Sequence, residues 1–228
     1  MAIGKLASGL AIAIVLTGSA SAQQAASATP QTLSCDFAGK DTPAAHERKM
    51  LKATPGVRRL SAHVLQVNAE SGVRRFVDKK PYREELDGFH WTYCGYDAGL
   101  DAHLIGMEDG DLFSGQLFFD RTGRALDAGR TVYPSPNGKR LLAAKQHDGK
   151  YLEDWVLLDA SGAVLWTGDS GETRGDIIVS EYQGPRWMGD DAIRVVALCN
   201  DRIRTKGEAT LVRDGKGWRW RSDLRCKV

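Results

Sequence analysis

The chain has 228 residues, with 31 Lys or Arg, 29 Asp or Glu and a formal net charge of +2 at pH 7. This near balance excludes a role as a bulk polyelectrolyte, which needs a large excess of one charge. A single domain of this size buries about 70% of the surface of its unfolded chain, so it does not depend on disulfides to fold.

Residues 1–22 have the features of a secretory signal peptide. Lys5 supplies a positive charge, residues 6–16 form a mostly apolar run, and the small residues Ala20 and Ala22 fit the subsites of a signal peptidase. The run is shorter than the roughly 20 residues of a membrane-spanning helix, and no later segment approaches that length. We therefore expect cleavage after Ala22, a soluble product in the periplasm or outside the cell, and no membrane span.

The rest of the chain divides into a leader and one domain. Residues 23–34 are mostly small and polar, a composition that does not order itself, and they are predicted to form a flexible leader. Residues 35–228 are predicted to form a single β-rich domain. The run from Pro43 to Lys52 is rich in helix formers and stops before Pro55, which predicts one short helix.

Beyond this helix, short apolar segments alternate with turns rich in Gly, Asp and Asn, which is typical of an antiparallel meander. Four segments have the pattern of a β-hairpin: residues 64–77, 117–126, 155–166 and 210–221. The predicted fold class is therefore all-β, mainly an antiparallel meander, with one short N-terminal helix.

Two of these hairpins belong to a longer repeated unit. Four pairs of positions are each 39 residues apart: Asp109-Gly110 and Asp148-Gly149, Asp120 and Asp159, Gly123 and Gly162, and Leu126 and Leu165. A looser third copy runs from Cys199 to Gly215. A period near 40 is typical of propeller blades, and the segment from Pro134 to Leu142 resembles the Pro-Asp-Gly-Lys turn of many blades. A propeller-like meander is favoured, and a sandwich of stacked meanders also fits.

The chain has four cysteines, at Cys35, Cys94, Cys199 and Cys226. An even number in an exported protein favours two disulfides, and no pair has the spacing of zinc ligands. Four cysteines allow three pairings. We favour Cys35 with Cys94 and Cys199 with Cys226, because the second pair would join consecutive strands near the C-terminus.

Charge is distributed in blocks. Residues 46–83 contain ten Lys or Arg and three acids, residues 84–120 contain nine acids and no Lys or Arg, and residues 202–228 contain nine basic and three acidic residues. Such blocks are either neighbouring strands that neutralise one another or separate faces that attract different partners. The near-neutral total favours mutual neutralisation.

The segment 97–111 carries five carboxylates: Asp97, Asp101, Glu108, Asp109 and Asp111. Calcium takes six to eight oxygen ligands from flexible loops, so these residues are candidate calcium ligands. The spacing of an EF-hand loop is absent, and ordinary turns explain the run more readily. Two facing carboxylates would also suit the hydrolysis of a glycosidic bond, which makes a secreted hydrolase the alternative function.

The segment from Gly168 to Gly171 resembles the nucleophile loop of trypsin-like serine proteases, and Ala44-Ala45-His46 resembles their histidine motif, with Asp101 as a third member. Glu47 follows the histidine where that family has a Cys, and His46 falls in the predicted helix. Because a triad is defined by geometry, we interpret residues 168–176 as a polar loop between strands.

The segment Trp218-Arg219-Trp220-Arg221 places both tryptophans on one face of a strand and both arginines on the other. The indoles are expected in the core, or else as a stacking surface for a sugar or a partner loop. The arginines are then free to pair with acidic strands or to meet an anionic partner. His90, between Phe89 and Trp91, is the histidine favoured to lie in a pocket.

No nucleophile-base pair, metal motif or phosphate loop stands out, while hairpin turns are abundant. The sequence therefore favours an exported bacterial binding module that engages another protein or a cell-envelope polymer. One version is an inhibitor or immunity-type protein that plugs the cleft of a wall-degrading enzyme, with the charge blocks steering the encounter. Nucleic acid is not an expected partner, and no cofactor is expected apart from the calcium alternative.

Overall fold

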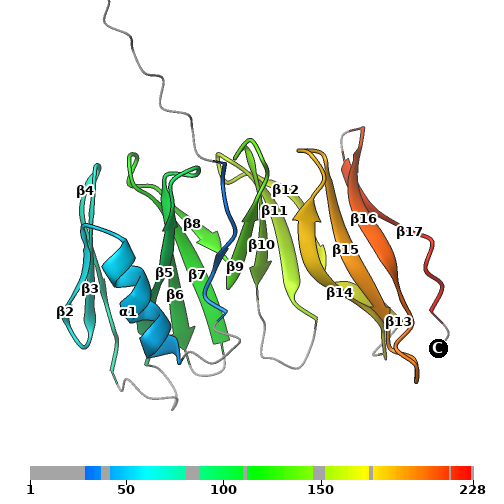
Figure 1. Ribbon diagram of the computed structural model, residues 1–228, viewed down its shortest axis with the longest axis horizontal. Helices are drawn as coiled ribbons and strands as arrows, with labels where there is room; N and C mark the ends of the chain where they lie inside the picture. The colour runs from blue at the N-terminus through cyan, green and yellow to red at the C-terminus, as the bar shows by residue number, and fades with distance from the viewer. Residues whose placement is uncertain are drawn as a thin grey trace, which may run out of the picture.

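The computed structural model describes residues 29–36, 42–80, 88–109, 112–145, 152–174, 177–215 and 217–226. The predicted signal peptide, most of the predicted leader, and Asp111 lie outside these residues. The described chain forms four small antiparallel sheets that stand side by side in a row (Figure 1).

The sheets follow one another in chain order. The first contains β2 (Val57–Ser61), β3 (Val64–Ala69) and β4 (Gly72–Val77). The second contains β5 (His90–Asp97), β6 (Ala102–Asp109), β7 (Leu112–Phe119) and β8 (Ala125–Ala128). The third contains β1 (Leu33–Ser34), β9 (Thr131–Pro134), β10 (Arg140–Lys145), β11 (Asp154–Asp159) and β12 (Val164–Asp169). The fourth contains β13 (Gly171–Arg174), β14 (Ile177–Trp187), β15 (Ala192–Cys199), β16 (Lys206–Asp214) and β17 (Gly217–Ser222).

Neighbouring strands in each sheet are antiparallel, and all four predicted hairpins are present. The prediction of an all-β, mainly antiparallel fold with one short helix is therefore confirmed. Residues 171–174, expected within a loop, instead form β13, which pairs with β14. Leu33 and Ser34, expected in the flexible leader, form β1, because Leu33 is buried and the Ser34 hydroxyl lies 2.8 Å from that of Thr131 in β9.

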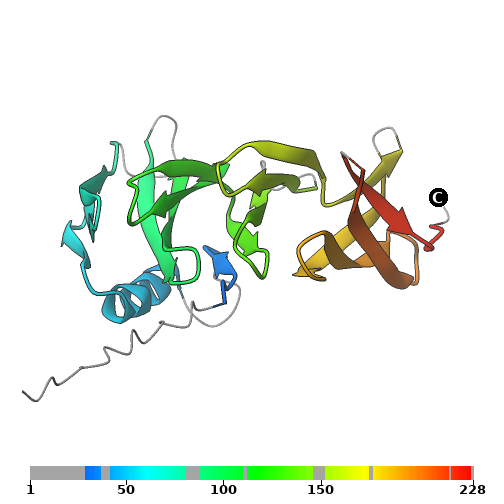
Figure 2. The ribbon, with the colours of Figure 1, turned by 90° about the horizontal axis from the view of Figure 1, so that it is seen from above.

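The core lies between consecutive sheets. One buried cluster joins the first and second sheets, another the second and third, and another the third and fourth. Side chains alternate across each strand, so Leu141 packs toward the second sheet and its neighbour Leu142 toward the fourth. The first and last sheets lie at opposite ends of the row (Figure 2), so the described residues form an open stack of blade-like sheets without the ring closure of a propeller.

The predicted helix is α1 (Pro43–Ala53). The hydroxyl of Thr42 accepts a hydrogen bond from the Ala45 amide at 3.3 Å, and Pro43 occupies the start of the helix, where its missing N–H costs nothing. Met50 and Leu51 pack against the core between the first two sheets. Among the described residues, no helix has the length and apolar character needed to cross a bilayer.

The 39-residue offset corresponds to the same hairpin in consecutive sheets. Asp120 and Gly123 lie in the turn between β7 and β8. Asp159 ends β11, and Gly162 lies in the equivalent turn between β11 and β12. The two glycines have φ of 67° and 87°, the left-handed region that other residues rarely adopt. The repeated Asp and Gly therefore mark the same hairpin turn in the second and third sheets.

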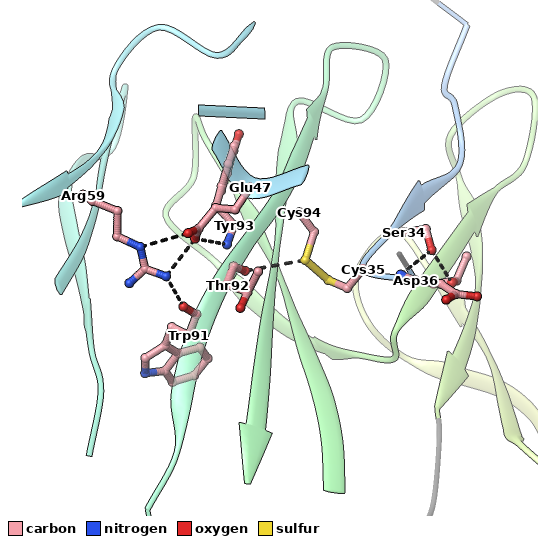
Figure 3. Close-up of a disulfide and its surroundings, with 10 residues drawn as sticks. Ser34, Cys35, Asp36, Glu47, Arg59, Trp91, Thr92, Tyr93 and Cys94 are labelled. Carbon is pink, nitrogen blue, oxygen red and sulfur yellow. Dashed lines mark hydrogen bonds and ion pairs between the residues drawn. A yellow bond between two sulfur atoms is a disulfide. The ribbon is translucent and has the colours of Figure 1, made fainter. Parts of the chain in front are cut away.

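Two disulfides join Cys35 to Cys94 and Cys199 to Cys226, the pairing favoured by the sequence. Cys35 follows β1 and Cys94 lies in β5, so the first bond ties the third sheet to the second (Figure 3). The second closes the fourth sheet on itself. Two disulfides indicate that the protein matures in an oxidising environment.

Candidate functional site

Basic side chains gather at the N-terminal end of the row, on α1 and the first sheet. Residues 42–80 are described in full and include eight exposed Lys or Arg side chains: Arg48, Lys49, Lys52, Arg58, Arg74, Arg75, Lys79 and Lys80. The same stretch has three acids, of which Glu70 alone is exposed. We call this region the basic end.

Glu47, an acid of this stretch, is neutralised inside the protein. Its Oε1 accepts hydrogen bonds from Nη2 of Arg59 and from the amide of Tyr93, both at 2.8 Å (Figure 3). Arg59 Nη2 also donates to the carbonyl oxygen of Trp91. Both charged side chains are half-buried, so this ion pair adds little charge to the surface.

The other two acids are also engaged. Asp78 is buried, and its carboxylate accepts from the Trp91 amide at 2.8 Å and lies 3.2 Å from Nδ1 of His63. Glu70 pairs with Arg121 at 3.7 Å. By contrast, seven basic side chains form no ion pair with any described carboxylate: Arg48, Lys49, Lys52, Arg58, Arg74, Arg75 and Lys79. The basic end therefore presents its charge to solvent.

The C-terminal basic block differs in part, because four of its arginines pair with acids of their own sheet. Arg204 lies 3.1 Å from Glu181, and Arg213 lies 3.5 Å from Asp191. Arg219 and Arg221 both pair with Asp214. The predicted neutralisation thus occurs for these four arginines of the fourth sheet, whereas the seven side chains of the basic end have no acidic partner among the described residues.

The first sheet has a side, the outer face, that points away from the second sheet. Strand register places Arg58, Gln66 and Arg75 in one cross-strand row. Val73 and Val77 lie on either side of Arg75 on the same face, because side chains alternate along a strand. They are 62% and 56% exposed. Figures 1 and 2 show no described element beyond this face.

Gln66 organises the centre of the outer face. Its side chain is polar and yet the residue is only 4% exposed, because its neighbours on both strands cover it. Its amide oxygen accepts from Nε of Arg75 at 3.0 Å, and its amide nitrogen donates to Asn68 at 2.9 Å. Arg75 is thereby held across the face, with its terminal nitrogens left for a partner.

The structure does not gather the four candidate calcium ligands among its described residues. Asp97 and Asp101 lie at one end of β6, while Glu108 and Asp109 lie at the other, about 23 Å away for seven residues of extended strand. The carboxylate of Asp97 accepts hydrogen bonds from two backbone amides, those of Gln31 at 2.8 Å and Leu100 at 2.7 Å. No cluster of three metal-binding side chains occurs among the described residues. The same separation affects the carboxylates of the hydrolase alternative.

His90 pairs with Glu108 across β5 and β6, with 3.0 Å between Nε2 and the carboxylate. The hydrogen bond to Glu108 raises the pKa of His90 above its ordinary value of 6.5. The same bond lowers the pKa of Glu108. Both side chains are partly exposed, so His90 belongs to a surface ion pair.

A buried polar chain was not singled out by the sequence. The Tyr93 hydroxyl lies 2.9 Å from Nδ1 of His103, whose Nε2 lies 3.1 Å from Asp120. Burial lowers the pKa of His103 and raises that of Tyr93. Both imidazole nitrogens are therefore occupied, and the chain is suited to holding the second sheet together rather than to proton transfer with a ligand. No sequence motif marks it, because its members meet through strand register.

The two C-terminal tryptophans pack between the third and fourth sheets. The ring centre of Trp220 lies 4.4 Å from that of Tyr182 and 6.1 Å from that of Trp155. Trp218 faces Trp187 at 6.3 Å, with Arg140 over its ring. This packing accords with a core position for both indoles.

The protease-like residues lie apart. Ser170 is buried between β12 and β13, and its hydroxyl accepts a hydrogen bond from the Glu153 amide at 2.8 Å. His46 lies in α1, near the opposite end of the row (Figure 1). The two residues therefore form no catalytic pair.

A groove of about 400 Å³ lies between β1, α1 and β5. Its lining includes Asp36, His46, Met50, Tyr96 and Asp97. The groove adjoins the basic end through α1. No family model, curated protein or solved structure matches this chain.

Proposed function

We propose that the protein is an exported bacterial binding module, acting in the periplasm or outside the cell, and that its basic end binds an anionic partner. The observation that supports this most strongly is the set of seven basic side chains without a described ion-pair partner. An inhibitor or immunity-type protein that binds an acidic cleft is one form of such a module.

Electrostatics explains how this surface would work. Several like charges on one end of a molecule attract an oppositely charged partner over a distance of about a Debye length and raise the association rate. The acids within residues 42–80 do not offset this field, because Glu47 and Asp78 are engaged internally. The balanced net charge of the whole chain is compatible with this, since acids lie in other parts of the chain, above all in residues 84–120.

Binding is preferred to the hydrolase alternative for a specific reason. Asp101 and Glu108, from the acidic segment, lie at opposite ends of β6. Glycosidase carboxylates must lie about 5 to 9.5 Å apart. Asp101 and Glu108 are therefore too far apart to share that chemistry.

The test uses the disulfide-bonded protein and two defined polyanions, poly-L-glutamate and inorganic polyphosphate. We expect binding at an ionic strength of about 0.01 M that weakens strongly at about 0.15 M, as the Debye length shortens from about 30 to 8 Å. The triple variant R48E/K49E/K52E is expected to weaken binding about tenfold or more.

A matched control carries the same change in net charge at the other end of the row. Arg202, Lys206 and Arg225 are exposed, and the variant R202E/K206E/R225E reverses all three. Equal losses in the two triple variants would show that net charge, not the basic end, drives association. Absence of binding by the unmodified protein to either polyanion would refute the proposed function. Capture from periplasmic extract at low and high salt then identifies the natural partner.

A further inference from the structure

The outer face of the first sheet differs from the sheet faces inside the row, which are covered by a neighbouring sheet. Val73 and Val77 are more than half exposed there, and Leu60 on β2 is 44% exposed. Isolated exposed apolar residues are common on protein surfaces. Here they lie on one small sheet that also carries Arg58 and Arg75.

The arrangement of this face suits a carboxylate between two apolar contacts. Nε of Arg75 donates a hydrogen bond to the side-chain oxygen of Gln66 at 3.0 Å, which orients the guanidinium across the sheet. The terminal nitrogens of an arginine bind a carboxylate in a forked geometry that a lysine cannot reproduce. Val73 and Val77 flank this position two residues away on either side along β4.

The charged and apolar side chains of the outer face favour one class of binding partner over others. A symmetric dimer through this face is disfavoured, because it would bring two basic ends together. A polyphosphate or other purely ionic polymer would pair with the arginines but would leave the valines in water. A protein surface with acidic and apolar side chains satisfies both.

We propose that the outer face docks an acidic protein, whose apolar side chains cover Val73 and Val77 and whose carboxylates pair with Arg58 and Arg75. This inference rests on the proposed function and narrows it to a class of partner. The partner takes the place that a further sheet would occupy in the row. It therefore buries the one face of the first sheet that lacks a described neighbour.

The experiment compares three probes at equal anionic charge: poly-L-glutamate, a random copolymer of glutamate and tyrosine, and inorganic polyphosphate. The dissociation constant of each is measured for the disulfide-bonded protein by calorimetry at low ionic strength. We expect the copolymer to bind about tenfold more tightly than poly-L-glutamate, because its aromatic residues cover apolar surface.

Two variants locate this preference. V73T/V77T keeps β-branched side chains on β4 and is expected to remove the tenfold preference while poly-L-glutamate binding remains. V164T is the control, because Val164 is 61% exposed on β12, away from the basic end. It is expected to keep the preference. Unchanged thermal unfolding of both variants confirms that they are folded.

The outcomes separate the two proposals. If polyphosphate binds as tightly as the copolymer and V73T/V77T changes nothing, the partner is an ionic polymer and the docking inference is wrong, while the proposed function stands. If V73T/V77T and V164T lose the preference equally, the contact lies elsewhere and the inference is again wrong. If no probe binds, both proposals fail.

Discussion

Glu47 and Arg59 meet beside β5, and together they bond to two main-chain groups on its edge. The carboxylate accepts from the Tyr93 amide at 2.8 Å, and the guanidinium donates to the Trp91 carbonyl oxygen (Figure 3). Because β5 is an edge strand of the second sheet, these groups have no strand partner on that side. The ion pair thus protects the edge and anchors α1 and β2 to it.

Replacing Arg59 by Ala is expected to lower the free energy of unfolding by about 2 kcal/mol, because the half-buried Glu47 loses its cation. Urea denaturation with the disulfides intact measures this loss. Arg58→Ala on the same strand is the control, since Arg58 is exposed and is expected to change stability by no more than about 0.5 kcal/mol. Equal losses would contradict the role assigned to the Glu47–Arg59 pair.

Acidification is expected to destabilise the protein through His103. Burial lowers the pKa of His103 below its ordinary 6.5, so the unfolded chain binds a proton more readily than the folded one. The contribution of neutral His103 to the free energy of unfolding is fully present above pH 6.5, and it is lost as the pH falls toward the lowered pKa. His103→Gln should flatten the pH dependence between about 7 and 5, by at most about 1.4 kcal/mol per pH unit. If the variant's free energy of unfolding, measured by urea denaturation, changed with pH as steeply as that of the unmodified protein, this role of His103 would be contradicted.

The surface ion pair of His90 and Glu108 makes stability depend on pH in the opposite direction. Glu108 raises the pKa of His90 above 6.5, so the stabilising contribution of His90 is present below that pH and is lost as the pH rises through the raised pKa. Glu108→Gln is expected to bring the pKa of His90 back toward 6.5 and to leave that of His103 unaltered. Titration of the imidazole signals by NMR reads both histidines in one experiment. A shift in both would indicate a general structural change.

The disulfide between Cys35 and Cys94 closes a loop with a sequence separation of 59. Replacing both cysteines by Ala is expected to cost about 4 kcal/mol, most of it through the unfolded state. It should also speed proteolysis on the N-terminal side of α1, because β1 is then held by its short pairing with β9 and by packing of Leu33. The C199A/C226A variant serves as the comparison. Equal protease resistance of β1 in both variants would show that pairing alone holds this strand.

Both the backbone conformation and the lack of room for a side chain favour glycine at position 162. Its φ is 87°, and a Cβ there would lie 2.4 Å from Cδ2 of Leu126. Gly162→Ala is expected to destabilise the protein by about 2 kcal/mol. Gly215 has a φ of 61° with open space around it, so Gly215→Ala carries the backbone cost without the clash and should lose about 1 kcal/mol. Thermal or urea unfolding distinguishes the two, and the reverse order would contradict the steric argument.

Local chemistry explains why much of the fold was predictable. Pro43 and the residues after it predict α1 to within one residue of its observed end. The repeated Asp and Gly at 120 and 123, and again at 159 and 162, predict two outer turns, because such turns need a left-handed residue. Asp101 and Glu108 show the limit. They are close in sequence, but an extended strand separates them, and residue order does not reveal which end of a strand faces a site.

The amino-acid sequence by itself determined the β-hairpins, the single helix and the favoured cysteine pairing, because each depends on residues within a turn or on a small set of alternatives. Tertiary structure decided the open row of sheets and the fate of the charges. Whether an arginine is neutralised depends on which strand lies beside it. Arg213 of β16 meets Asp191, which immediately precedes the neighbouring strand β15, whereas Arg75 meets Gln66 on a face that no described sheet covers.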